Sequence, residues 1–248
     1  GADYRKKLVW QTGQGFDVKP YYRAEDLEGI AATDSLPGEF PFVRGNRVKG
    51  NDWFVRQNIR VGRIADTNSK ALDILMKGVN SLGFILDDKK EYSHDDIDGL
   101  CRNIFAEIVE LNFVCGLQAE NIANIYRTLV DQYNRDFHKV HGSVNFDPLG
   151  RLVVKGNYYE SFDQDFDRCR RMLVATEHLP HFTVITVNGR NFHHAGSSIV
   201  QELAYSLAAG AEYLTQLTER GLSVDKVAAG MRFNFSVGPD YFMEMAKI

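Results

Sequence analysis

The chain has 248 residues, of which 44% are hydrophobic and 25% are charged, and it contains three cysteines. A disordered chain would be poorer in apolar residues, and a small disulfide scaffold would be shorter and richer in cysteine, so both classes are excluded. The formal net charge of −4 gives no electrostatic footprint for nucleic acid or for an anionic membrane surface.

The first part of the chain predicts an extended arm. Residues 1 to about 50 lack helical periodicity and contain three of the six prolines, each of which fixes φ and removes a backbone donor. The apolar side chains between these prolines indicate an arm that lies along a surface. We therefore divide the chain into an arm and linker at 1–65 and a second domain at 66–248.

From residue 66 onward, patterns typical of helices and strands alternate. Helices are expected from Asp66 to Gly78, from Ala119 to about Phe137, over Ser161–His178 and Ser197–Arg220, and after Pro239. Strands are expected over Leu82–Leu86, Ile108–Val114, Phe182–Val187 and Met231–Val237. The segment His141–Tyr159 interrupts this rhythm and is interpreted as an inserted excursion with a turn at Asp147–Gly150.

Continuous apolar strands that alternate with helices predict a parallel sheet covered by helices. The length from Leu82 onward accommodates about five βα units at roughly 30 residues each, fewer than the eight that close a barrel. We expect an α/β fold: a partial TIM-type (β/α)8 barrel preceded by an extended amino-terminal arm. The free strand edges of an incomplete barrel would invite pairing with another chain.

The cysteines and the apolar segments indicate the cellular compartment of the protein. Cys101, Cys115 and Cys169 are odd in number and widely spaced, as expected of reduced thiols. The charged first residues lead into no signal-peptide core, and no uninterrupted apolar run approaches the ~18 residues of a membrane span. These features predict a soluble, cytoplasmic chain.

Two clusters carry candidate chemistry. In the first, Arg56 and Gln57 follow Trp53, and a guanidinium beside an aromatic ring could clamp an anion. The alternative is structural, with Trp53 anchoring the segment and Arg56 paired to a nearby carboxylate. In the second, Asn191, His193 and His194 follow the strand at 182–187, at its carboxyl end, where barrel enzymes build their sites.

Metal binding by the second cluster is not expected. Glu202 lies eight positions beyond His194, which matches no compact zinc signature. A metal-dependent barrel hydrolase that uses His193, His194 and Asp87 is retained as one alternative function.

Four separated segments resemble the methylmalonyl-CoA mutase family, in the same order along the chain. They are Val-Lys-Pro-Tyr-Tyr at 18–22, Leu-Pro-Gly-Glu-Phe-Pro-Phe-Val-Arg-Gly at 36–45, Gly-Leu-Ser-Val-Asp at 221–225 and Val-Gly-Pro-Asp-Tyr-Phe-Met-Glu-Met-Ala-Lys at 237–247. The resemblance implies a (β/α)8 barrel that binds an acyl-CoA and an arm that contacts a partner subunit. It also implies a radical interconversion of (R)-methylmalonyl-CoA and succinyl-CoA that adenosylcobalamin starts.

The chain departs from the catalytic members at both clusters. Those members carry Arg-Pro-Trp-Thr-Ile-Arg-Gln-Tyr where residues 51–58 stand here, so the CoA-side arginine is Asn51 and the active-site tyrosine is Asn58. They carry Gly-Tyr-His-Met-Gln-Glu-Ala-Gly at 189–196, so the histidine that bonds the thioester carbonyl is Asn191. Asparagine donates a neutral hydrogen bond but transfers no proton at neutral pH.

These losses make the chain most similar to the small, non-catalytic subunit of heterodimeric family members. The resemblance then implies a large catalytic subunit as partner, with substrate acyl-CoA and adenosylcobalamin bound there. No catalytic residue is expected on this chain, only a degenerate substrate site, whose members are Trp53, Arg56, Gln57, Asn58, Asn191, His193 and His194. An acyl-CoA isomerase with altered specificity is the other alternative.

Cobalamin is not expected on this chain itself. The family's cobalamin motif, Asp-x-His-x-x-Gly, has its nearest match at Asp136–His141, which lacks the glycine and is expected to lie on a helix.

Overall fold

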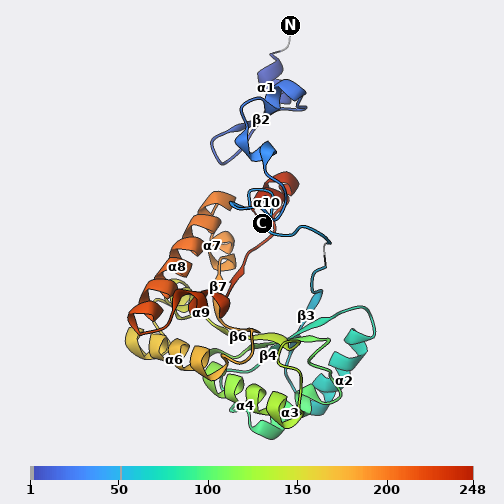
Figure 1. Cartoon of the computed structure of the whole chain (residues 1–248), viewed down its shortest axis with the longest axis vertical. Helices are drawn as coiled ribbons and strands as arrows, with labels where there is room; N and C mark the ends of the chain where they lie inside the picture. The colour runs from blue at the N-terminus through green and yellow to red at the C-terminus, as the bar shows by residue number, and fades with distance from the viewer. Residues whose placement is uncertain (1–2, 51, 248) are drawn as a thin grey trace.

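The structure is a computed structural model that describes residues 3–50 and 52–247. Six parallel strands form one sheet in the order β3-β4-β5-β6-β7-β8 (Figure 1). The strands are β3 (Arg56–Arg60), β4 (Ser81–Ile85), β5 (Glu110–Val114), β6 (His141–Phe146), β7 (His181–Asn188) and β8 (Met231–Asn234). Each strand pairs with the next one along the chain, as in a barrel, whereas a doubly wound sheet reverses its order at a switch point. The predicted partial TIM-type barrel is therefore confirmed.

Helices follow the strands and cover the outer face of the curved sheet (Figure 1). They are α2 (Ile64–Leu75), α3 (His94–Cys101), α4 (Ala119–Gln132), α5 (Pro148–Lys155), α6 (Phe162–Ala175), α7 (Arg190–His194), α8 (Ile199–Glu219), α9 (Val224–Ala229) and α10 (Tyr241–Lys247). A short 3-10 turn, η3 (Gly116–Gln118), precedes α4. Several helices begin with a serine cap, such as Ser161, whose side chain accepts a hydrogen bond from the backbone of Gln164.

The two faces of the sheet differ in character because successive side chains of a strand point to opposite faces. Leu82, Phe84, Leu111 and Phe113 point outward and are fully buried beneath the helices. Their rings and branches form the main core, in which Phe84 stacks on Phe113. Burial of this apolar face fixes the strand register and leaves the alternate residues on the inner face.

The amino-terminal arm extends away from the sheet, past the level of α10 (Figure 1). It contains α1 (Tyr4–Leu8), a hairpin of two short strands, β1 (Trp10–Gln11) and β2 (Asp17–Val18), and the 3-10 turns η1 (Ala24–Leu27) and η2 (Ala31–Asp34). Among the residues of this arm whose side chains are described, none is buried, and Ile59 is the first buried residue in the described part of the chain. The described part of the arm therefore has no core of its own.

The structure corrects two predictions about where the barrel elements lie. Residues 56–60 were placed in the arm, but they form β3, which pairs with β4 along its whole length. Exposed polar residues alternate around Ile59, so the strand carries too weak an apolar signal to be recognised. The segment 141–159 was interpreted as an excursion, but it is the regular unit of β6 and α5, whose helix begins at Pro148 after the cap Asp147.

Smaller corrections concern the helices. The helix expected to begin at Asp66 starts at Ile64, with Asp66 in its first turn. The helix expected to reach Phe137 ends at Gln132, so residues 136–140 form a turn rather than helix. Helices α1, α3, α7 and α9 were not predicted, and α1 lies within the arm that was expected to be extended. Within the described part of the chain, no helix combines the length and the apolar character that a membrane crossing requires.

Candidate functional site

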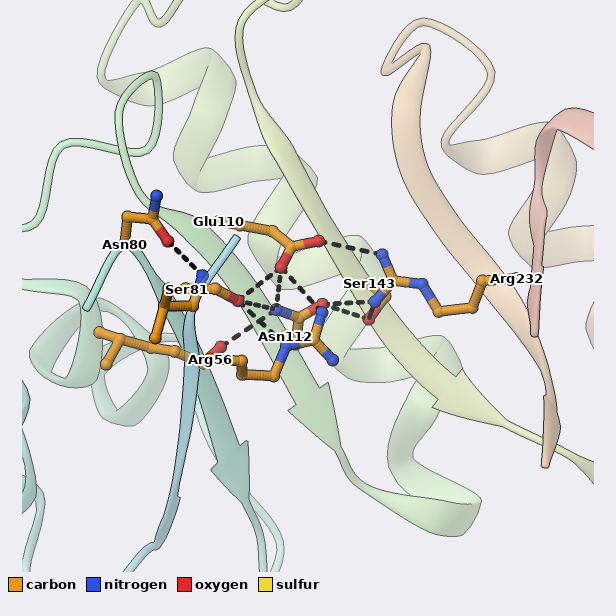
Figure 2. Close-up of polar contacts among 9 residues, drawn as sticks. Arg56, Asn80, Ser81, Glu110, Asn112, Ser143 and Arg232 are labelled. Carbon is orange, nitrogen blue, oxygen red and sulfur yellow. Dashed lines mark hydrogen bonds and ion pairs between the residues drawn. The ribbon is translucent and has the colours of Figure 1, made fainter. Parts of the chain in front are cut away.

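The inner face of the sheet is polar, which is unusual because barrel interiors are filled mainly by branched apolar side chains. Inward positions on neighbouring strands carry Arg56, Ser81, Glu110, Asn112, Ser143 and Arg232. Figure 2 shows that these side chains come from β3, β4, β5, β6 and β8 and converge over the middle of the sheet.

Glu110 is the centre of this inner-face network (Figure 2). The residue is 5% exposed, and its carboxylate forms ion pairs with Arg56, at 2.8 Å, and with Arg232, at 3.0 Å. The hydroxyl of Ser81 donates to the same carboxylate, and Asn112 Nδ2 donates to it at 3.1 Å. One buried carboxylate thus accepts hydrogen bonds from four neighbours.

The second arginine also binds across the sheet. Arg232 Nη1 donates to Asn112 Oδ1 at 2.7 Å and to Ser143 Oγ at 3.0 Å. Ser143 Oγ in turn donates to Asn112 Oδ1 at 2.6 Å. The inner-face network is therefore continuous from β3 to β8 and leaves both arginines engaged by groups of this chain.

The electrostatics of the network follow from burial and pairing. Burial of Glu110 would raise the pKa of its carboxyl, but hydrogen bonds from Ser81 and Arg56 and the charge of Arg56 outweigh it and lower the pKa to about 2. Burial lowers the pKa of Arg232, against the favourable charge of Glu110. Glu110 is therefore ionised at neutral pH and holds the two cations in place.

A cavity of about 470 Å³ lies beside this network on the inner face. Arg56 and Asn58 line it together with Arg190 of α7 and Asn145. Gly83 makes room for Asn58, because a Cβ at this glycine would lie 2.0 Å from Asn58 Oδ1. Of the predicted site residues, Arg56 and Asn58 therefore share one cavity.

Asn191 lines a neighbouring cavity of about 280 Å³ at the carboxyl ends of the strands. The buried carboxylate of Asp147 lies at the same place, where it accepts hydrogen bonds from Tyr213, at 2.8 Å, and from Asn188 Nδ2, at 2.8 Å. Burial raises the pKa of Asp147, and the hydrogen bonds of Gly150 and Tyr213 oppose that rise. Asp147 was recognised from sequence only as part of a turn.

His193 lies beside a buried ion-pair cluster rather than in either cavity. Its Nδ1 is 3.6 Å from Glu202 Oε2, beyond hydrogen-bond distance. Lys247 Nζ binds the same Glu202 oxygen at 2.9 Å and Glu244 at 2.6 Å. This cluster joins α10 to α8. The charged groups next to His193 therefore hold two helices together.

The remaining predicted site residues are exposed. Trp53 is 68% exposed, and Gln57 and His194 are exposed as well. The expectation that Trp53 anchors its segment is wrong, whereas the accompanying expectation that Arg56 pairs with a carboxylate is confirmed by Glu110. Asn51 lies outside the described residues.

His138, the histidine in the nearest match to the cobalamin motif, is exposed on a turn, where its backbone N–H donates to Asp136. Among the residues that the structure describes, no three histidine, cysteine, aspartate or glutamate side chains are grouped so that they could hold a metal ion. His193, His194 and Asp87, the residues of the hydrolase alternative, are among those described residues and form no such group.

The inner-face network was missed although its signal is present in the sequence. The strands were interpreted as continuously apolar, yet polar residues stand at alternate positions in Glu-Leu-Asn-Phe at 110–113 and in Met-Arg-Phe-Asn at 231–234. Period-two alternation predicts one polar and one apolar face. What the alternation does not reveal is that the partners of Glu110 lie on strands as far away as β8.

Sequence comparison shows which known proteins this chain resembles. The family model described as methylmalonyl-CoA mutase matches residues 11–98 and 92–248. A methylmalonyl-CoA mutase small subunit from Porphyromonas gingivalis is 43% identical over all of this chain and 40% of its own length. The small subunit from Streptomyces virginiae is 33% identical, again over all of this chain and 40% of its own length. The large subunit of the same organism is 26% identical over 97% of this chain and 36% of its own length.

The chain thus spans about 40% of the length of the small subunits that it matches. The family match covers nearly all of its residues, and two relatives exceed 30% identity along its full length. On these grounds the chain belongs to the methylmalonyl-CoA mutase family.

Proposed function

We propose that this chain serves in the small, non-catalytic subunit of a heterodimeric methylmalonyl-CoA mutase. The observation that carries the proposal is the inner-face network. Arg56, the cation that the resemblance places in the substrate site, is bonded to Glu110 and Ser81. A cation held by a buried carboxylate of its own chain is not free to bind the carboxylate or phosphate of a substrate.

The identities of two residues support the same proposal. Asn58 and Asn191 stand where catalytic relatives carry a tyrosine and a histidine, and they line different cavities. An amide supplies neither an aromatic wall nor a group that gains a proton at neutral pH. The higher identity to the small than to the large subunit of Streptomyces virginiae agrees with this assignment.

The exposed side chains of the arm are a further argument for a partner subunit. Its exposed apolar side chains include Trp10, Phe16, Tyr21, Tyr22, Phe40 and Phe42. Exposed aromatic side chains in such number are typical of an interaction surface. We propose that the arm binds the large subunit and that the barrel rests beside it.

The cofactor and the substrate belong to the partner in this proposal. Adenosylcobalamin, which supplies the radical that starts the rearrangement, would be held by the large subunit together with acyl-CoA. This chain would contribute contacts and stability, without residues that touch the reacting atoms. Its location would be cytoplasmic, in keeping with three cysteines that form no disulfide.

An acyl-CoA isomerase with altered specificity is a second candidate, favoured by one observation. The inner-face cavity of about 470 Å³ is lined by Arg190 as well as Arg56. Arg190 is exposed at the start of α7, so it could meet an anionic ligand that Arg56 cannot.

Association with a large subunit tests the proposed function. Mixed at micromolar concentration, the full-length protein and its large subunit are expected to elute from gel filtration as one 1:1 complex, with its mass checked by light scattering. Separate elution of the two chains under these conditions would refute the proposal.

A further inference from the structure

A separate cavity of about 230 Å³ lies on the outer side of the sheet, between α3 and α4. The loop 102–109, which connects α3 to β5, closes one side of it. Its floor is aliphatic, because Ile104, Leu111 and Leu129 line it and each is at most 4% exposed. An apolar cavity of about 150 Å³ is enough to hold benzene, so this one has room for an apolar group of about six carbon atoms.

The exposed residues of the lining mark the mouth of this cavity. Phe105 is 58% exposed and Tyr133 is 50% exposed, and Arg102 is exposed as well. The guanidinium of Arg135 lies over both rings, at 5.3 and 5.8 Å from their centroids. The cavity therefore opens to solvent where aromatic rings and guanidinium groups meet.

Arg102 places an unpaired positive charge at this mouth. Its side chain forms no hydrogen bond or ion pair with any residue that the structure describes. The second cation of the lining, Arg135, pairs with Glu107 at 3.2 Å. The carboxylate of Asp98, which also lines the cavity, accepts a hydrogen bond from the Tyr133 hydroxyl at 2.6 Å. The group left to bind a ligand by charge is thus the guanidinium of Arg102.

Two observations fix where this charge lies. The hydrogen bond to Asp98 raises the pKa of Tyr133, and the charges of Arg102 and Arg135 oppose that rise, so both guanidinium groups act on a hydroxyl at the mouth. The backbone of Arg102 is anchored, because Asn68 Nδ2 donates to its carbonyl at 2.9 Å. The unpaired cation therefore stands on a held residue next to the opening.

We propose that the cavity between α3 and α4 binds a small monocarboxylate whose apolar tail has about six carbon atoms. The tail occupies the aliphatic floor and the carboxylate stays at the mouth, where the planar donors of Arg102 match its two oxygens. The site is independent of the proposed function, since it lies outside the sheet and shares no lining residue with the inner-face network.

Calorimetry and NMR with hexanoate test this proposal on the full-length protein. Hexanoate is expected to bind with one-to-one stoichiometry and to shift the backbone amide signals of the residues that line the cavity. 1-Hexanol lacks the charge and 1-hexylamine reverses it, so each should bind at least about fivefold more weakly. The amine is the sharper comparison, because the carboxylate of Asp98 is in the same lining.

Three variants locate the site. Arg102→Gln removes the charge from an exposed side chain, so it should weaken hexanoate binding by about fivefold and leave 1-hexanol binding within about twofold. Arg60→Gln is the matched control, because Arg60 is an exposed residue of β3 outside this lining, and hexanoate affinity should not change. Ala106→Leu is expected to fill the cavity and abolish binding of both compounds, with folding checked by circular dichroism.

The proposal is overturned if hexanoate at about 10 mM does not bind. It is also overturned if 1-hexanol or 1-hexylamine binds as tightly as hexanoate, or if Arg102→Gln weakens hexanoate binding no more than Arg60→Gln does. Hexanoate binding that persists in folded Ala106→Leu would place the ligand outside this cavity and overturn it likewise.

Discussion

Glu110→Gln is expected to lower the free energy of unfolding at pH 7 by about 3 kcal/mol. The substitution leaves Arg56 and Arg232 beside each other without the carboxylate that neutralises them, and breaking a buried ion pair from one side typically costs about 3–5 kcal/mol. The lowered pKa of Glu110, about 2 against an ordinary 4.5, corresponds to a similar energy of about 3 kcal/mol. Urea-induced unfolding followed by circular dichroism measures the change.

Glu120→Gln is the matched control for this prediction. Glu120 also lies between two arginines, Arg171 at 2.6 Å and Arg168 at 3.5 Å, but its side chain is half-buried, at 27% exposure, whereas that of Glu110 is 6% exposed. Exposed ion pairs contribute about 0–1 kcal/mol, and water screens the half-buried pairs of Glu120 more than the buried pairs of Glu110, so this variant should lose less stability. Equal losses in the two variants would show that burial of the inner-face network contributes nothing.

The difference in stability between wild type and Glu110→Gln is expected to depend on pH with a definite sign. The folded-state pKa of Glu110 lies below its ordinary value, so its contribution is fully present above about pH 4.5 and is lost as the pH falls towards about 2. The difference in unfolding free energy between wild type and Glu110→Gln should therefore shrink across that range. A difference that stays constant from pH 6 to pH 2.5 would contradict the assigned ionisation.

Deletion of residues 1–50 is expected to weaken binding of the large subunit while the stability of the barrel stays nearly unchanged. Because no arm residue with a described side chain is buried, the unfolding free energy of the barrel should change by less than about 1 kcal/mol. Affinity for the large subunit should fall by roughly hundredfold or more, since a few aromatic anchors usually carry most of an interface's energy. Surface plasmon resonance with immobilised large subunit measures the affinity.

Met76→Ala is the control for the deletion, because Met76 is 87% exposed and lies outside the arm, at the end of α2. Its affinity for the large subunit should match that of the unchanged protein. If the deletion variant binds as tightly as this control, the partner contacts lie on the barrel, and the role proposed for the arm is wrong.

The barrel could be predicted from the sequence to the extent that its elements are apolar. Phe182–Val187 and Ser161–His178 stand out because burial on one or both sides demands apolar residues at fixed spacing. The strand at 56–60 escaped, since only Ile59 of its five residues is buried and the other four expose their side chains. The unit at 141–159 escaped because Gly142, Ser143 and Asn145 of β6 resemble loop residues when read without their neighbours.

The candidate site was predictable residue by residue but not as an arrangement. That Arg56 would meet a carboxylate followed from its charge, while the identity of that carboxylate depends on the register that sets Arg56 beside Ser81 and Ser81 beside Glu110. The two halves of the predicted substrate site do not merge. Asn58 lines the inner-face cavity, Asn191 the neighbouring one, and His193 lies against the Glu202 cluster.

Turnover by the isolated protein tests the central claim most directly. The full-length protein, free of any large subunit, would be incubated with methylmalonyl-CoA and adenosylcobalamin, and succinyl-CoA would be measured by mass spectrometry. We expect no product above the protein-free background and product once the large subunit is added. Formation of succinyl-CoA, or rearrangement of any other acyl-CoA, by the protein alone would contradict a non-catalytic role.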